Sequence, residues 1–146
     1  MGKVEASITI HRSVEDVFAV VSNFEHNSKW SSATVEDKIT SPGPIGVGSK
    51  ARLVSKFLGR RIENFAEVTE FELNRRVTMR STSRPMPFQG SLTLEPVEGG
   101  TRVNTTFKLE PGGLIKLAEP LVMTMAKRQW DSDLANLKDL MEAHAL

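Results

Sequence analysis

Hydrophobic and polar residues alternate strictly near the start of the chain and then change to a helical spacing. Residues 4–10 are apolar at every second position, which is the period of a strand with one buried face. Ser13 follows as a helix N-cap, and the apolar residues after it recur at steps of three and four. We predict a strand, a helix, a second short helical turn over residues 23–30 and a brief strand over 35–39.

From residue 49 onward the helical spacing disappears, and turn residues recur about every ten to twelve positions. This regular spacing is typical of an antiparallel meander. The expected strands cover residues 49–57, 60–71, 75–84, 88–96 and 101–109.

The inward phase of these strands contains many small or polar residues. They are Ala51, Ser55, Asn64, Ala66, Ser81, Ser83, Gly90 and Thr105. A polar side chain on an inward face needs a hydrogen-bond partner or contact with water, so these positions favour a wet cavity. The alternative is a shifted strand phase, which turns the same residues to solvent. The phase is least certain at Asn64 and Phe65.

After Pro111-Gly112-Gly113 a helical spacing returns and lasts from Leu114 to about Met141. Pro120 is expected to kink this helix or to divide a first turn from its main body. The apolar stripe that faces the sheet is Met123, Ala126, Trp130, Leu134, Leu137 and Met141.

Only the helices are available to cover the apolar face of this sheet. The expected fold is therefore a single α+β domain over residues 1–146. It has a curved antiparallel sheet of six to seven strands wrapped around a long C-terminal helix, with two short helices after the first strand.

Composition narrows the classes of function. Nineteen Lys and Arg residues balance eighteen Asp and Glu residues, which argues against a general nucleic-acid surface. The chain has no Cys, so disulfides and thiolate sites are excluded, and the reducing cytoplasm is the expected compartment. Its three His residues fit neither a Ser-His-Asp set nor a metal-ligand spacing, so we expect no metal and no cofactor. No apolar block has the length of a signal peptide or a membrane-spanning helix, so no stable membrane anchoring is expected.

Several short motifs occur in an order that is typical of one superfamily. They are Ile8–Phe18, Trp30, Gly46–Gly48, Val68–Phe71, Leu94–Val103 and Leu134–Lys138. Over essentially the whole chain they resemble the START-like or helix-grip (SRPBCC) superfamily, and more narrowly its bacterial polyketide cyclase/dehydrase and lipid-transport branch. The resemblance implies a deep cavity between sheet and helix. Members use this cavity to carry lipids, sterols, polyketides or plant hormones, and a few catalyse cyclisation or dehydration.

The predicted site follows from the inward residues and the family cavity. Its ligand-binding residues are Trp30, Ser55, Phe57, Asn64, Met79, Ser81, Phe88, Leu92, Thr105, Phe107, Leu117, Leu121 and Met125. For the apolar members the alternative is ordinary core packing. Arg60, Arg61, Arg84 and Met86 are expected at the cavity mouth, where the arginines either attract an anionic head group or remain solvated.

The leading hypothesis is binding or transport of a small hydrophobic or amphipathic ligand that is a lipid, a polyketide or sterol-like. One alternative is a cyclase or dehydratase, although the chain has no Tyr and no Cys to serve as pocket acid or base. Another is a protein-interaction module, which a filled interior would favour. A cavity of roughly 300 to 1,000 Å³ favours the first two. The chain is expected to be a monomer or a homodimer.

Overall fold

The computed structural model describes residues 2–57, 59–82, 87–109 and 119–146. The order of its elements confirms the predicted helix-grip fold. They are strand β1 (Gly2–Ile10), helix α1 (Val14–Val21), 3-10 turn η1 (Phe24–His26), helix α2 (Asn27–Trp30), strands β2 (Thr34–Ile39), β3 (Lys50–Phe57), β4 (Arg60–Glu72), β5 (Arg76–Ser81), β6 (Phe88–Val97) and β7 (Gly100–Leu109), and helix α3 (Glu119–Glu142).

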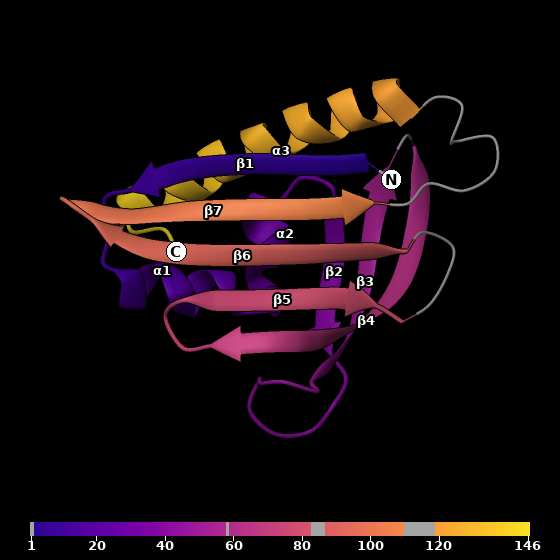
Figure 1. Ribbon diagram of the computed structural model, residues 1–146, viewed down its shortest axis with the longest axis horizontal. Coiled ribbons are helices and arrows are strands. Elements are labelled where there is room, and N and C mark those ends of the chain that lie inside the picture. The colour runs from indigo at the N-terminus through magenta and orange to yellow at the C-terminus, as the bar shows by residue number, and fades with distance from the viewer. Residues whose placement is uncertain (1, 58, 83–86, 110–118) are drawn as a thin grey trace.

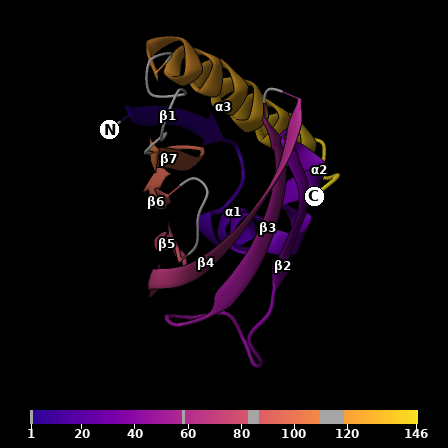
Figure 2. The ribbon, with the colours of Figure 1, turned by 90° about the vertical axis from the view of Figure 1, so that its right-hand side faces the viewer.

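The seven strands form one antiparallel sheet in the order β1-β7-β6-β5-β4-β3-β2. The sheet curls strongly, so that β2 and β3 turn to face the opposite half of the sheet (Figure 2). Helix α3 runs alongside β1 and over the open side of the curl, α1 lies inside the curl, and α2 packs against β2 and α3 (Figures 1 and 2). The curled sheet therefore encloses an interior, and α3 fills only part of it.

The strand register confirms the predicted inward phases. Leu53 pairs with Asn64, and Leu92 pairs with Thr105, so each pair shares one face of the sheet. Asn64 is buried, whereas Phe65 is 42% exposed. The phase that the sequence left open in β4 therefore places Asn64 inside.

The predicted N-cap of α1 forms at Ser13. The Asp16 amide donates to Ser13 Oγ at 3.2 Å. The Asp16 carboxylate accepts from Arg12 Nε at 3.2 Å, and Arg12 Nη1 donates to the carbonyl of Met141 at 2.7 Å. The start of α1 is thus tied to the end of α3.

The core occupies the end of the interior that lies under the C-terminal half of α3. Leu134, Leu137 and Met141 are fully buried there, in a cluster that includes Phe18 and Val103. Trp130, which was expected to be buried, is only partly buried. The N-terminal half of α3 lies over the other end, and that end holds the cavity.

The predicted start of the last helix, residues 114–118, lies outside the described part of the chain. Pro120 is the second residue of α3 in the part of the helix that the structure describes.

Candidate ligand-binding site

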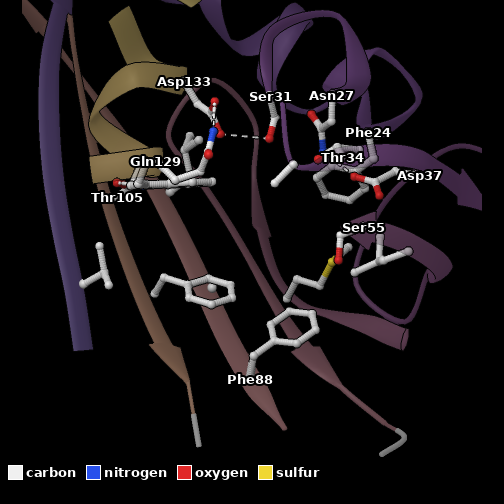
Figure 3. Close-up of a pocket in the computed structure, with 18 of the residues that line it drawn as sticks. Phe24, Asn27, Ser31, Thr34, Asp37, Ser55, Phe88, Thr105, Gln129 and Asp133 are labelled. Atoms are coloured by element: carbon white, nitrogen blue, oxygen red, sulfur yellow. Dashed lines mark hydrogen bonds between the residues drawn. The ribbon is translucent and has the colours of Figure 1, made fainter. Parts of the chain in front are cut away.

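A cavity of about 320 Å³ lies between the concave face of the sheet and the N-terminal half of α3. Helix α3 contributes Ala126, Gln129, Trp130 and Asp133 to its lining. In Figure 3 the polar side chains of α2, β2 and α3 gather at one end of the cavity, and Phe88 lies at the other. The volume falls within the predicted range and is that of a small-molecule site.

The sheet supplies the apolar walls as rows of paired residues. Met79, Gly90, Phe107 and Val4 form one row across β5, β6, β7 and β1. The aromatic rings continue this wall, because Phe88 stacks on Phe107 with ring centroids 5.4 Å apart.

The two tryptophans extend the aromatic wall toward the helices. Phe107 lies 6.2 Å from Trp130, and Trp130 lies 6.3 Å from Trp30, both measured between ring centroids. Trp130 is fixed by a hydrogen bond of 2.6 Å from its Nε1 to Thr105 Oγ1. These contacts fix the ring of Trp130 against the concave face of the sheet.

Gly90 keeps the middle of the row open. A Cβ atom at this position would lie 3.4 Å from Phe107 Cδ2, an ordinary contact distance, so larger side chains fit only by extending into the cavity.

One polar group at the edge of the cavity is a buried carboxylate with its partners in place. Asp133 is 2% exposed and accepts from Ser31 Oγ at 3.0 Å, from the Ser32 amide at 3.2 Å and from Gln129 Nε2 at 2.9 Å. Hydrogen bonds to both oxygens satisfy this buried carboxyl group, and they join the segment that follows α2 to α3.

A second carboxylate, Asp37 on β2, has a different environment. Asn27 Nδ2 donates to Asp37 Oδ2 at 2.9 Å, and the two side chains point toward each other at the wall (Figure 3). Burial raises the pKa of Asp37 from 3.8 to about 6, and the hydrogen bond from Asn27 opposes that rise. The carboxyl therefore changes charge close to neutral pH.

Asp37 also belongs to a row that crosses three strands. It pairs with Leu53, and Leu53 pairs with Asn64. Two strand spacings separate Asp37 from Asn64, about 10 Å between their backbones, with both side chains on the concave face.

Three polar atoms in the lining residues are buried without a hydrogen-bond partner among the residues that the structure describes. They are Trp30 Nε1, Asn27 Oδ1 and Asn64 Oδ1. A buried group of this kind typically costs about 1 to 3 kcal/mol. Each such atom retains the capacity to form one more hydrogen bond.

Eight of the predicted site residues line this cavity: Trp30, Ser55, Asn64, Met79, Phe88, Leu92, Thr105 and Phe107. That they contact a ligand remains a prediction. Ser81 is not part of the lining, because its Oγ accepts from the Phe88 amide at 2.9 Å. Outside the described part of the chain lie Leu117, Ser83, Arg84, Met86 and the side chain of Phe57.

The prediction that Leu121 and Met125 form part of the wall is wrong. They are 63% and 41% exposed. A helix turns by about 100° per residue, so both lie roughly 140 to 180° around α3 from Leu134. Arg60 and Arg61 are also exposed and do not line the cavity, so the expected basic mouth is not formed by this pair.

The sequence did not identify Asn27, Ser31, Asp37, Gln129 or Asp133, all of which line the cavity. Asp37 carried a usable signal, because it shares the inward phase of its short strand with Ile39. Asp133 lies next to Leu134 at the border of the apolar stripe, where a carboxylate is equally consistent with solvent.

The described residues contain no cluster of three or more His, Asp or Glu side chains that could hold a metal ion. Within the same residues, no helix is both long and apolar enough to cross a membrane.

The fold is the START-like helix-grip architecture, with a cavity between the sheet and α3. Residues 1–142 match the family described as polyketide cyclase / dehydrase and lipid transport. The chain therefore belongs to this family, as the motif order predicted. No curated protein sequence gives a significant match.

Solved structures agree with this fold at low sequence identity. A protein from Thermus thermophilus is 20% identical with a TM-score of 0.85, over 99% of this chain and 100% of that chain. The Zhui aromatase/cyclase of a Streptomyces species is 13% identical with a TM-score of 0.79, over 99% and 96%. A START superfamily protein from Mycobacterium smegmatis is 17% identical with a TM-score of 0.71, over 97% and 95%. At these identities the likeness is one of fold.

Proposed function

We propose that this protein binds or transports a small hydrophobic or amphipathic molecule in the cavity between the sheet and α3. The observation that carries the proposal is the cavity of about 320 Å³, which has mainly apolar walls and buried polar atoms that no described residue satisfies. Family membership supports the same reading, since the family description names lipid transport. An interaction module has no need for such an interior.

A neutral fluorescent probe tests the proposal directly. N-phenyl-1-naphthylamine should bind the folded protein at one site and raise the thermal midpoint, because a ligand of the native state shifts the unfolding equilibrium. Gly90→Leu should weaken binding by about tenfold or more, since the added side chain occupies the space of the probe. Leu121→Ala, on the exposed face of α3, is the matched control and should bind like the wild type. Loss of affinity in both variants, or in neither, would refute this location of the site.

The natural ligand is best sought in protein purified from its own host. Native mass spectrometry should detect a retained molecule whose mass adds to that of the chain. Gly90→Leu purified in the same way should lack that added mass.

A second candidate function is a cyclase or dehydratase, and Asp37 is the observation that favours it. A carboxyl group with a pKa of about 6 is suited to exchange protons near neutral pH. Turnover of a polyketide-like substrate would then show an inflection near pH 6 that Asp37→Asn abolishes. If Asn64→Leu also reduced such turnover about a hundredfold, the pure binding function would have to be abandoned.

A further inference from the structure

We infer that the ligand carries a neutral hydroxyl group, which accepts from Trp30 Nε1 and donates to Asn64 Oδ1, and that the cavity discriminates against carboxylates. This inference rests on the proposed function. It assigns a chemical class to the ligand and a specific role to two residues.

The three unpaired atoms demand both a donor and an acceptor from the ligand. Trp30 Nε1 can only donate, whereas Asn27 Oδ1 and Asn64 Oδ1 can only accept. Trp30 is 4% exposed and Asn64 is 9% exposed, and Asn27 is partly buried. The hydrogen-bond partners of these atoms must therefore come from the ligand rather than from bulk solvent.

Common ligand groups differ in whether they meet this demand. A carboxylate or a ketone only accepts, so it leaves the asparagine oxygens unsatisfied. An ammonium group only donates, so it leaves the Trp30 N–H unsatisfied. A hydroxyl group has one hydrogen to donate and two lone pairs that accept, so a single hydroxyl can pair with the Trp30 N–H and with one asparagine oxygen.

The charges around the cavity also disfavour an anion. Among the described lining residues, Asp37 and Asp133 are acidic and Lys56 is the basic one. The acidic side chains are buried or partly buried, whereas Lys56 is exposed and screened by solvent. At pH 7.5 an ionised Asp37 in the wall repels a second carboxylate brought into the cavity. A fatty acid is thus a poorer ligand than an alcohol or phenol of the same size.

The size of the cavity suggests suitable probes. A volume of about 320 Å³ would hold about ten water molecules at liquid density, so small bicyclic compounds are appropriate. Naphthalene, 2-naphthol and 2-naphthoate share one ring system and differ in the polar group. Naphthalene leaves water most readily, so any preference for 2-naphthol must arise from hydrogen bonds in the site.

The experiment measures the dissociation constants of the three probes at pH 7.5 by equilibrium fluorescence titration. The wild type should bind 2-naphthol about tenfold more tightly than naphthalene, which is what one or two net hydrogen bonds provide. It should bind 2-naphthoate more weakly than 2-naphthol. Asp37→Asn should improve binding of 2-naphthoate by about tenfold. Glu36→Gln, an exposed acid on the same strand, should leave it unchanged.

Three single variants test which side chains form hydrogen bonds to the hydroxyl group. Trp30→Phe and Asn64→Leu should each reduce the preference for 2-naphthol over naphthalene about three- to tenfold. Trp130→Phe is the matched control: it also lines the cavity, but its Nε1 already donates to Thr105 Oγ1. Any change it makes should affect both probes alike. Because the readout is a ratio of affinities, a general loss of packing cancels.

Three outcomes separate this inference from the proposed function. If the wild type binds naphthalene as tightly as 2-naphthol, the hydroxyl assignment is wrong and the binding function stands. If the folded protein, monitored by circular dichroism, binds none of the three probes, the proposed function itself fails. If 2-naphthoate is the tightest ligand, the charge argument and the hydroxyl assignment are both overturned.

Discussion

Asp37 provides the sharpest test of the energetics of the cavity wall. Replacing it with Asn removes the charge, keeps the shape, and preserves an oxygen that can accept from Asn27 Nδ2. The folded-state pKa of Asp37 is raised, so the native protein favours the protonated form. The stability that this group contributes is therefore present below about pH 4 and is lost as the pH rises through about 6.

The size of the effect follows from the pKa. A rise from 3.8 to about 6 corresponds to about 3 kcal/mol, at about 1.4 kcal/mol for each pKa unit. Asp37→Asn should therefore be about as stable as the wild type at pH 4 and about 3 kcal/mol more stable at pH 7.5. For a chain of this length, that gain corresponds to roughly 6 to 12 °C in the thermal midpoint.

Urea unfolding followed by circular dichroism at several pH values between 4 and 8 measures this difference. Taking the variant minus the wild type at each pH removes the contributions of all other carboxylates. Glu36→Gln is the control, since Glu36 is exposed on the same strand, and its difference should stay small across the range. If the difference in unfolding free energy between Asp37→Asn and the wild type did not change with pH, the argument that burial disfavours the charged form of Asp37 would be refuted.

Three further predictions concern packing, space and polarity. Leu137→Ala should lower the free energy of unfolding in urea by about 2 to 5 kcal/mol, because Leu137 is fully buried. Leu121→Ala should lower it by less than about 0.5 kcal/mol, because Leu121 is exposed. Equal losses would contradict the assignment of the buried face of α3. Gly90→Leu should keep a cooperative thermal transition while losing probe affinity, and an unfolded variant would mean that the middle of the sheet has no free space. Asn64→Leu should not destabilise the protein, because it removes a buried acceptor that lacks a partner; a loss above about 1 kcal/mol would reveal a hydrogen bond to Asn64 that this reasoning omits.

The sequence by itself determined the phases of the strands and the main face of α3. Both depend on local periods, two residues for a strand and 3.6 for a helix, so they can be counted along the chain. Leu92 and Thr105 were placed on one face of the sheet before any pairing was known, and the register agrees. The helical period also places Leu121 and Met125 away from the face of α3 that lines the cavity. Their prediction as wall residues was wrong because it did not follow this period.

Only the tertiary structure decided which polar groups meet in the cavity. Ser31 and Asp133 are 102 residues apart in sequence, and their hydrogen bond exists because the end of α2 packs against α3. Asp37 meets Asn27 because β2 turns back beside the short helices. No local period relates such residues, since their contact depends on how separate elements pack. The pKa of Asp37, and which buried atoms remain unpaired, follow from those long-range contacts and not from the identity of the residues.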